Sequence, residues 1–207
     1  MPALQTIRCA VISEGLYSWP HYIARARALY ERADLNVELT VTGSSTLQLE
    51  RLIAGEYDIG LQQADHVVRG VERGADLFVI MAQALAPGLT LVVAPGIKAC
   101  ADLKGRDIAV DGARTGYALL LRKLLAGQGL GDGDYAFREI GGSRERFDAL
   151  KAGAAAASLL NPPFDRNLIA AGCGSLGTTG ELSRLATAAP AVSASERSFE
   201  PPISLNV

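Results

Sequence analysis

Residues 22–61, YIARARALYERADLNVELTVTGSSTLQLERLIAGEYDIGL, decide the fold of this chain, because each boundary within them carries a chemical signal. The stretch predicts a helix, a strand, a serine-rich turn, a second helix and a second strand. Ser18 is expected to cap the first helix, with Trp19 and Pro20 in its first turn, where a missing N–H costs nothing. Apolar residues at helical spacing predict one buried face, formed by Tyr22, Ile23, Ala26 and Tyr30.

The remainder of this stretch predicts a parallel βαβ unit. Residues 36–41 alternate apolar and polar side chains, which is the period of a strand with one buried face. Ser45 with Gln48 three residues later fits a capping box that starts the second helix, and Gly55 suits its end. Residues 57–61 are short and apolar, as inner parallel strands are. We expect a right-handed crossover between the two strands.

Composition favours a globular α/β protein that does not bind nucleic acid. Of the 207 residues, 49% are hydrophobic and 20% charged, and the formal net charge is -2. The 20 basic residues are dispersed among 22 acidic ones, so the basic surface that a phosphate backbone requires is not expected. Cys9, Cys100 and Cys173 form neither a metal-binding spacing nor a disulfide framework. No apolar run reaches the roughly 18 residues of a membrane span.

Beyond residue 61 the pattern predicts a crossover and then a second βαβ lobe. Residues 77–82, LFVIMA, and residues 90–94 are expected to form apolar strands, with Pro87 and Gly88 between them as a hinge. The second lobe should then repeat the order of strand, loop, helix and strand. Its expected strands are residues 107–110, 136–140 and 154–160, and its expected helices are residues 117–126 and 143–152.

Four segments carry a resemblance to a known family: YIARARALYERADLNVEL, TGSSTLQLERLIAGEYDIGL, LTLVVAPGIKACADLKGRDIAVDGARTGYALLLRKLLAGQGL and EIGGSRERFDALKAGAAAASLLNPPFDRNLIAAG. In this order they resemble the type II solute-binding proteins of ABC importers, the branch that binds alkanesulfonate, taurine, nitrate and thiamine-pyrimidine precursors. The resemblance implies a two-lobed, periplasmic-binding-protein-like α/β fold with mainly parallel sheets, flanking helices and a ligand cleft between the lobes. Lobe I is expected over residues 1–86 and lobe II, with the crossover strand, over residues 87–176. Residues 177–207 are interpreted as an atypical tail, truncated relative to the family or poorly ordered.

The ligand site is expected where strand carboxyl ends meet helix N-termini, because open parallel sheets leave a crevice there with free N–H donors. The loops at these points bring together hydroxyls, amides, backbone N–H groups and aromatic rings, which suit a polar ligand with a planar or apolar body. The candidate ligand-binding residues are Ser13, Glu14, Tyr17, Trp19, Gly43, Ser44, Ser45, Gln62, Gln63, Arg114, Thr115, Gly116, Tyr117, Gly142, Ser143, Asn161 and Phe164.

Several of these residues also have plain structural interpretations. Ser45 and Ser143 fit ordinary helix caps as well as ligand contacts. Trp19, beside a proline, fits either a hydrophobic staple or a stacking surface for a ligand. Arg114 at the start of a helix favours anion recognition over a solvated surface position. Glu14 is interpreted as a hydrogen-bond acceptor for a cationic or amino group.

The resemblance implies a solute-binding protein that captures a small polar or aromatic metabolite for an ABC-type importer, with a permease as partner. A cytoplasmic enzyme on the same fold, decarboxylase-like or thiamine-pyrimidine-synthase-like, is the alternative, and a ligand-sensing effector domain is the third. No catalytic residue, cofactor or metal is predicted, because common catalytic motifs are absent and the four lysines fall outside the expected cleft loops. The sequence as written shows no signal peptide, so the location is periplasmic if a leader was removed and cytoplasmic otherwise. Incomplete cover of lobe I would favour self-association.

Overall fold

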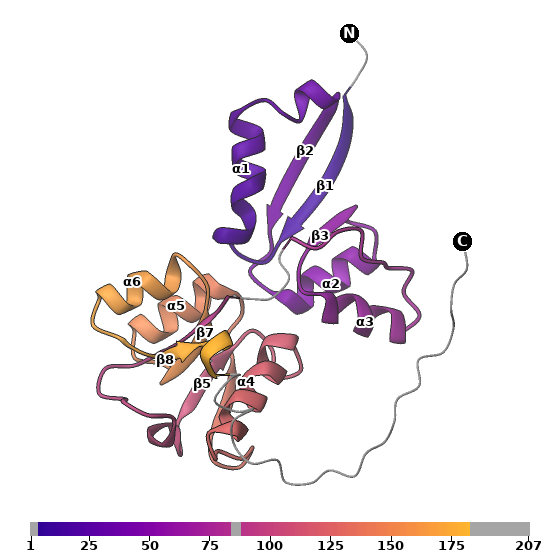
Figure 1. Cartoon of the computed structure of the whole chain (residues 1–207). Helices are drawn as coiled ribbons and strands as arrows, with labels where there is room; N and C mark the ends of the chain where they lie inside the picture. The colour runs from indigo at the N-terminus through magenta and orange to yellow at the C-terminus, as the bar shows by residue number, and fades with distance from the viewer. Residues whose placement is uncertain (1–3, 84–87, 183–207) are drawn as a thin grey trace.

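The computed structural model describes residues 4–83 and 88–182, and these form two lobes, each built on its own sheet (Figure 1). In lobe I, β1 (Gln5–Val11) lies between β2 (Leu35–Val41) and β3 (Ile59–Leu61), and all three strands are parallel. Cys9 sets the register, since it stands opposite Leu39 on one side and Ile59 on the other. The two strands predicted in the opening stretch therefore flank a common parallel neighbour.

The helices of lobe I begin close to the predicted positions, but α1 ends at Ala26, short of Tyr30 on its predicted inner face, because the chain turns at Ala28 with φ 50°. They are α1 (Trp19–Ala26), α2 (Ser45–Ile53) and α3 (Ala64–Glu72), with 3-10 turns at Leu16–Ser18 and Glu31–Ala33. The cap of α2 is Ser44, whose Oγ accepts from the Leu47 N–H at 3.3 Å, so the predicted cap at Ser45 is one residue late. Ser18 precedes α1, but its hydroxyl bonds Gly15 instead of the helix. Gly55 follows α2 with φ 74°, the left-handed conformation that glycine commonly adopts just after a helix ends.

Lobe II holds a five-stranded mixed sheet in the order β6-β5-β7-β4-β8. Strand β5 runs parallel to β6 and β7, whereas β4 runs antiparallel to β7 and β8. The strands are β4 (Thr90–Val93), β5 (Asp107–Val110), β6 (Ala136–Glu139), β7 (Ala157–Leu160) and β8 (Gly174–Thr178). The helices are α4 (Gly116–Gly127), α5 (Ser143–Lys151) and α6 (Phe164–Ala170), with a 3-10 turn at Cys100–Leu103.

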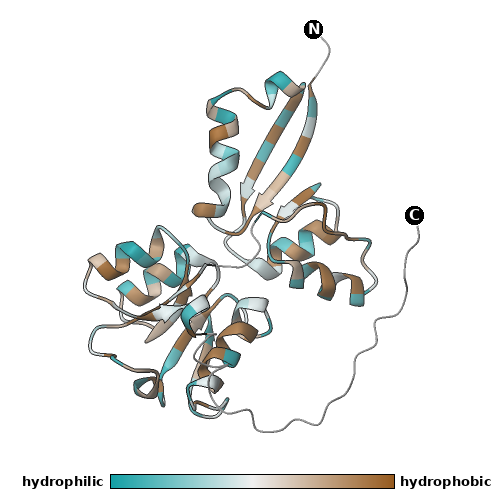
Figure 2. Ribbon diagram, in the orientation of Figure 1, coloured by the Kyte–Doolittle hydropathy of each residue, from teal (hydrophilic) through white to brown (hydrophobic). Residues whose placement is uncertain are grey.

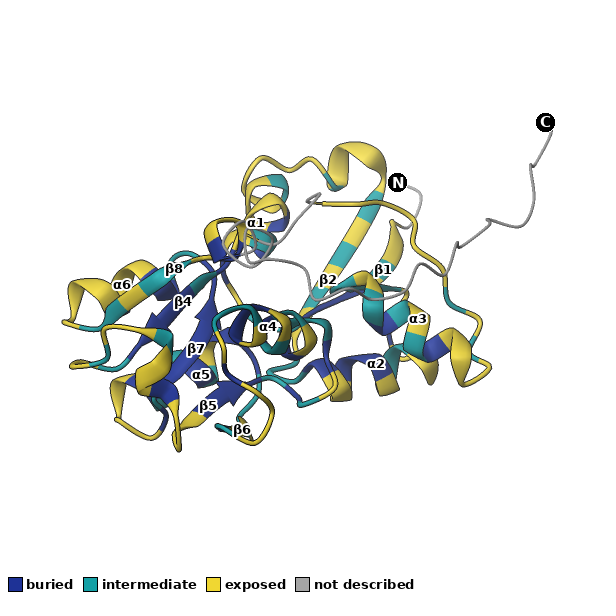
Figure 3. Ribbon diagram, turned by 60° about the horizontal axis from the view of Figure 1, so that its bottom comes forward, coloured by how far each residue is buried: buried dark blue, intermediate teal, exposed yellow. Residues whose placement is uncertain are grey.

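Most of the buried apolar side chains belong to lobe II, where β4, β5 and β7 are buried along almost their whole length (Figure 3). Leu91, Ile108 and Leu125 are fully buried and belong to one cluster, while Leu160 and Phe164 anchor a second cluster on the other side of the sheet. Burial of this apolar surface is the main source of stability for lobe II. No helix in the described parts of the chain is long and apolar enough to cross a membrane.

Lobe I is less completely buried than the sequence predicts. Helix α1 buries only His21, and Tyr22 and Ile23 on the predicted inner face are exposed. Periodicity shows which helix face is apolar, but burial also needs a packing partner, which α1 largely lacks among the described residues. In β2 the predicted alternation is confirmed at Val37 and Leu39, which are half-buried between exposed polar neighbours, but it is wrong at Val41, which is exposed.

The prediction of a strand over residues 77–82 is wrong in this structure. The segment follows α3 without pairing to any described strand, although every residue in it is hydrophobic (Figure 2). Phe78 and Met81 are 76% and 77% exposed. Of the predicted hinge, Gly88 is described and Pro87 lies outside the described residues. The predicted tail begins inside β8, Leu182 packs into the core of lobe II, and residues 183–207 lie outside the described part of the chain.

Candidate functional site

A cavity of about 620 Å³ lies between the lobes and takes lining residues from both. This volume is within the usual range for small-molecule sites. Its mainly polar lining group, here called the polar end, consists of Ser13, Tyr17, Gln62, Gln63, Asp65, His66, Asp111, Gly116, Tyr117, Gly142, Ser143, Arg146 and Asn161. Its mainly apolar lining group, here called the apolar end, includes Leu52, Ile59, Leu61 and residues 77–82, together with Asp58, Asp76 and Gln83.

Lobe I contributes groups that follow the carboxyl ends of β1 and β3. Ser13 lies just after β1, and Gln62 and Gln63 lie between β3 and α3. The buried Gln48 of α2 positions this loop, because its side-chain amide donates to the Leu61 carbonyl and to Gln62 Oε1, both at 3.2 Å. Gln62 Nε2 and Ser13 Oγ are buried and make no hydrogen bond within the described residues. Both groups therefore keep donor capacity at the cavity wall.

Lobe II contributes the first residues of two helices and the loop after β7. Gly116 and Tyr117 open α4, Gly142 precedes α5, and Ser143 is its first residue. The Ser143 hydroxyl donates to Asn161 Oδ1 at 2.7 Å, which fixes both side chains. The Tyr117 ring is largely buried at the cavity, and that burial raises the pKa of its hydroxyl, so the ring presents a neutral O–H.

Arg146 is a functional candidate that the sequence interpretation missed. It is 2% exposed, lines the polar end, and donates to the Gly142 and Leu159 carbonyls at 3.2 and 2.9 Å. No carboxylate in the described part of the chain lies within ion-pair distance of its guanidinium. Desolvation lowers its pKa, opposed by the more distant charge of Asp111. Its position three residues after Ser143 places it on the same helix face, which is the signal that could have identified it.

Asp65 joins the two lobes at the polar end. Its Oδ2 accepts the Gly116 N–H from lobe II at 3.0 Å and lies 3.1 Å from Arg69 Nη2 of its own helix. His66 beside it is 2% exposed, with Nδ1 unbonded within the described residues. Burial lowers the pKa of His66, and the charge of Asp65 opposes that shift. The imidazole is thus held neutral near neutral pH.

Nine of the predicted ligand-binding residues line this cavity: Ser13, Tyr17, Gln62, Gln63, Gly116, Tyr117, Gly142, Ser143 and Asn161. They come from five separate loops, which the fold brings to one place. This placement does not test whether any of the nine residues contacts a ligand, so their role in binding remains a prediction.

The other eight predicted residues lie elsewhere. Ser44 caps α2, Ser45 is buried behind it, and the Gly43 carbonyl accepts the Gly142 N–H at 2.9 Å. Trp19 is 53% exposed, and Glu14 accepts a hydrogen bond from Tyr22.

The last three of these eight are in lobe II. Phe164 packs in the core, with Arg144 5.1 Å from its ring centre. Arg114 and Thr115 line a separate hollow of about 230 Å³ beside α2 and α3. Thr115 is also the cap of α4, because its Oγ accepts the Ala118 N–H. No group of three or more potential metal ligands occurs among the residues that the structure describes.

Solved structures share this fold. A protein of Bordetella bronchiseptica RB50 is 24% identical, with a TM-score of 0.71, over 84% of this chain and 57% of its own. The alkanesulfonate-binding protein SsuA from Xanthomonas axonopodis pv. citri, bound to MOPS, is 23% identical, with a TM-score of 0.68, over 87% of this chain and 62% of its own. The periplasmic nitrate-binding protein NrtA from Synechocystis PCC 6803 is 16% identical, with a TM-score of 0.70, over 86% of this chain and 52% of its own.

These likenesses and the two-lobed architecture define a type II periplasmic-binding-protein fold, as the sequence predicts. The NMT1/THI5-like family model matches residues 16–162, and the chain belongs to that family. No curated protein matches the chain. The chain spans about three-fifths of the length of the first two structures above.

Proposed function

We propose that this protein is a solute-binding protein that holds a small organic anion in the interlobe cavity, as the receptor of an ABC-type importer. The observation that supports this proposal most strongly is the position of Arg146, a buried cation at the cavity wall with no ion-pair partner in the described chain. Arg146 donates to the Gly142 and Leu159 carbonyls and to the Ser143 and Ser158 hydroxyls, but these neutral groups do not balance its charge. A buried charge without a counter-charge is costly. An anionic ligand at the polar end would supply the counter-charge.

Lobe I supports the same assignment with neutral donors. Ser13 Oγ and Gln62 Nε2 are buried, and a group left unbonded in such a place costs about 1–3 kcal/mol. A ligand that accepts hydrogen bonds from Ser13 and Gln62 in lobe I and from donors beside Ser143 in lobe II would contact both lobes. Such a ligand binds the closed arrangement of the lobes more tightly than the open one, and it therefore stabilises the closed arrangement. The ring of Tyr117 offers a flat apolar contact for the body of the ligand.

The names of the related structures support the ligand class. One is an alkanesulfonate-binding protein and another a nitrate-binding protein. Both ligands are oxyanions, which matches a cavity with a buried guanidinium and hydroxyl and amide donors. For this chain, an organic sulfonate or carboxylate fits the combination of a polar end and an apolar end better than a bare inorganic anion.

The test is a thermal-shift screen of the purified protein against alkanesulfonates, nitrate, aromatic carboxylates and pyrimidines, followed by calorimetry on each hit. A ligand that binds only the folded state raises the melting temperature in a saturable way. We expect an organic sulfonate or carboxylate to produce the shift, and its uncharged amide or ester analogue to lose it. Equal binding of the neutral analogue would contradict the anion assignment, and no binding across the panel would contradict the proposed function.

A matched pair of variants on α5 locates the site. Arg146→Met removes the buried charge with a side chain of similar length and should abolish binding of the anionic hit. Arg144→Met removes the same charge from an exposed position two residues away and should leave binding unchanged. Ser13→Ala provides a check from lobe I, with an expected loss of about 1 kcal/mol in binding free energy. Normal binding by Arg146→Met would contradict the proposed role of this arginine.

A further inference from the structure

The lining of the interlobe cavity carries more carboxylates than cations. Among the described residues, one guanidinium lines it, that of Arg146, against the carboxylates of Asp58, Asp65, Asp76 and Asp111. Charges in a partly buried site interact more strongly than they do in water. The number of negative charges on a ligand therefore matters for its binding here.

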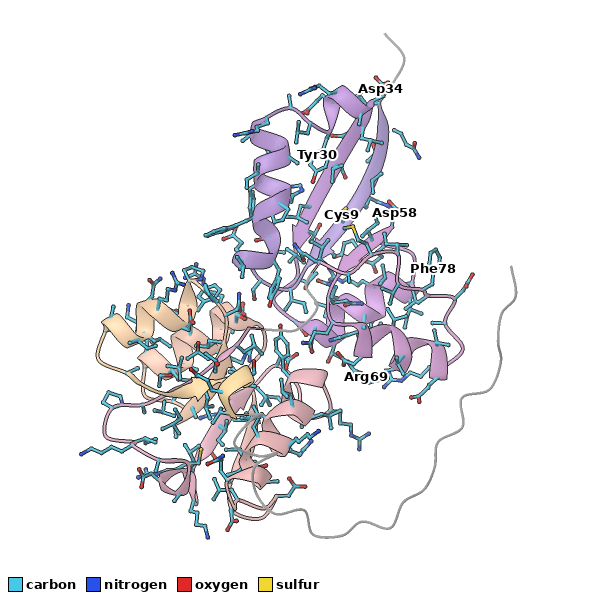
Figure 4. The ribbon with its side chains drawn as sticks, viewed as in Figure 1. Cys9, Tyr30, Asp34, Asp58, Arg69 and Phe78 are labelled. Atoms are coloured by element: carbon cyan, nitrogen blue, oxygen red, sulfur yellow. The ribbon has the colours of Figure 1, made fainter. Side chains whose placement is uncertain are left out.

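Two of these carboxylates are paired with arginines of lobe I. Asp58 Oδ1 lies 2.7 Å from Arg8 Nη2, and Asp65 Oδ2 lies 3.1 Å from Arg69 Nη2. Figure 4 labels Asp58 beside β3 and Arg69 on α3. Because each pair has no net charge, neither pair repels an anion strongly.

Asp111 is the carboxylate of the polar end that has no such pairing. It lies just after β5, is half-buried, and its Oδ1 accepts the Thr115 hydroxyl at 2.7 Å. No basic side chain in the described part of the chain lies within ion-pair distance of it. Asp76 is also without an ion pair there, but it belongs to the apolar end. A ligand head group held by Arg146 would therefore meet the charge of Asp111.

The charge of Asp111 acts on three helices that enclose the polar end. Desolvation lowers the pKa of Arg146 on α5, and Asp111 opposes that shift. Burial raises the pKa of Tyr117 on α4, and Asp111 adds to the rise. Burial lowers the pKa of His66 on α3, and Asp111 opposes that shift together with Asp65. The Asp111 carboxylate is thus close to every side chain that would surround the head group.

A second negative charge on the ligand has no further cation to meet. The first ligand charge already balances Arg146, and the cost of removing an ion from water grows with the square of its charge. At an effective dielectric constant of about 20, a like charge about 10 Å away weakens binding on the order of 10-fold.

We infer that this cavity accepts singly charged organic anions, such as sulfonates and carboxylates, and rejects doubly charged ones, such as phosphonates. Asp111 is the residue that sets this limit. The inference rests on the proposed anion-binding function and adds to it the charge of the ligand.

Calorimetric titration with hexanesulfonate and hexylphosphonate tests the limit, at a pH above the second pKa of the phosphonate. The two probes share one apolar body and differ in the charge of the head group. The monomethyl ester of hexylphosphonate keeps the phosphorus centre with a single charge, so it separates charge from head-group chemistry. We expect the sulfonate and the ester to bind, and the phosphonate to bind ~10-fold or more weakly than either.

Asp111→Asn assigns the limit to this residue. Asparagine keeps an acceptor for the Thr115 hydroxyl and removes the charge. Because repulsion scales with ligand charge, the sulfonate should bind ~10-fold more tightly to the variant and the phosphonate ~100-fold more tightly. Damage to the fold would weaken both instead. Asp107→Asn removes the same charge from the exposed opposite end of β5 and should leave both affinities unchanged.

Three results would overturn the inference. The first is equal affinity of the unmodified protein for the sulfonate and the phosphonate. The second is an unchanged ratio of these affinities in Asp111→Asn, or the same change in Asp107→Asn. The third is absence of binding by all three probes. The thermal-shift screen shows separately whether the proposed function stands, because it also covers carboxylates and the neutral analogues.

Discussion

Gly116→Ala tests one of the hydrogen bonds that join the two lobes. The Gly116 N–H of lobe II donates to Asp65 Oδ2 of lobe I at 3.0 Å. An added Cβ at Gly116 would lie 2.6 Å from both Asp65 Oδ1 and Gln63 Oε1, closer than real Cβ contacts allow. Because both atoms are side-chain oxygens of lobe I, the clash is relieved by turning these side chains away or by separating the lobes. Turning the Asp65 carboxylate away or separating the lobes breaks the hydrogen bond.

The size of the effect follows from the contact that is lost. A hydrogen bond to a charged acceptor contributes about 1.5–3 kcal/mol. Losing about 2 kcal/mol from the closed state lowers its population relative to the open state ~30-fold. Gly116 is the first residue of α4, where alanine does not strain the helix, so lobe II itself should keep or gain stability. The change therefore acts on the arrangement of the lobes and not on folding.

Small-angle X-ray scattering and calorimetry measure the two consequences. We expect Gly116→Ala to have a larger radius of gyration than the unmodified protein and ~30-fold weaker binding of any ligand that contacts both lobes. Gly133→Ala is the matched control, because a Cβ there meets no atom within 4 Å. An unchanged radius of gyration together with unchanged affinity in Gly116→Ala would refute the reasoning.

Three further predictions concern stability. Hydrogen bonds from Arg8 lower the pKa of Asp58 to about 2. The ionised Asp58 carboxylate therefore stabilises the folded state above pH ~4, and this stabilisation is lost as the pH falls to 2. Asp58→Asn should make an acid-unfolding curve flatter between these pH values. Burial lowers the pKa of His66 in the folded protein, so as the pH falls the imidazole takes up its proton in the unfolded chain before it does so in the folded protein. The stability of the fold therefore decreases below pH ~6.5. His66→Gln should reduce the loss of melting temperature between about pH 7 and pH 5. Leu91→Ala in β4 should cost about 2–5 kcal/mol in urea unfolding, whereas Leu119→Ala at an exposed position of α4 should cost less than 1 kcal/mol.

Local chemistry determined the elements of the opening stretch. Residues 45–53 form α2 between a serine cap and a glycine because these residues favour those backbone geometries in any context. Alternation likewise placed β2, and sequence signals placed β4 to β7, α4 and α5 of lobe II, whereas α6 and β8 were not predicted. The candidate loops were also found from sequence, because strand carboxyl ends in a parallel sheet gather on one edge.

Tertiary structure alone decided which loop residues face one cavity. Trp19 and Phe164 carry the same sequence signal as Tyr17 and Tyr117, yet one is exposed and one is in the core. The motif analysis did not identify Arg146, because a charged residue within a helix usually faces solvent and the packing of α5 against β7 buries it here.

The segment 77–82 shows the same division most clearly. Its six hydrophobic residues predict a strand, and the prediction failed because a strand exists only through hydrogen bonds to a neighbour. Sequence alone therefore determined the βαβ elements and the set of loops, because their signals come from residues that are near one another in the chain. It also indicated the family, because four segments of the chain resemble that family in the same order. Only the tertiary structure decided the cavity and the Asp65–Gly116 contact, because each depends on groups that are distant in the chain.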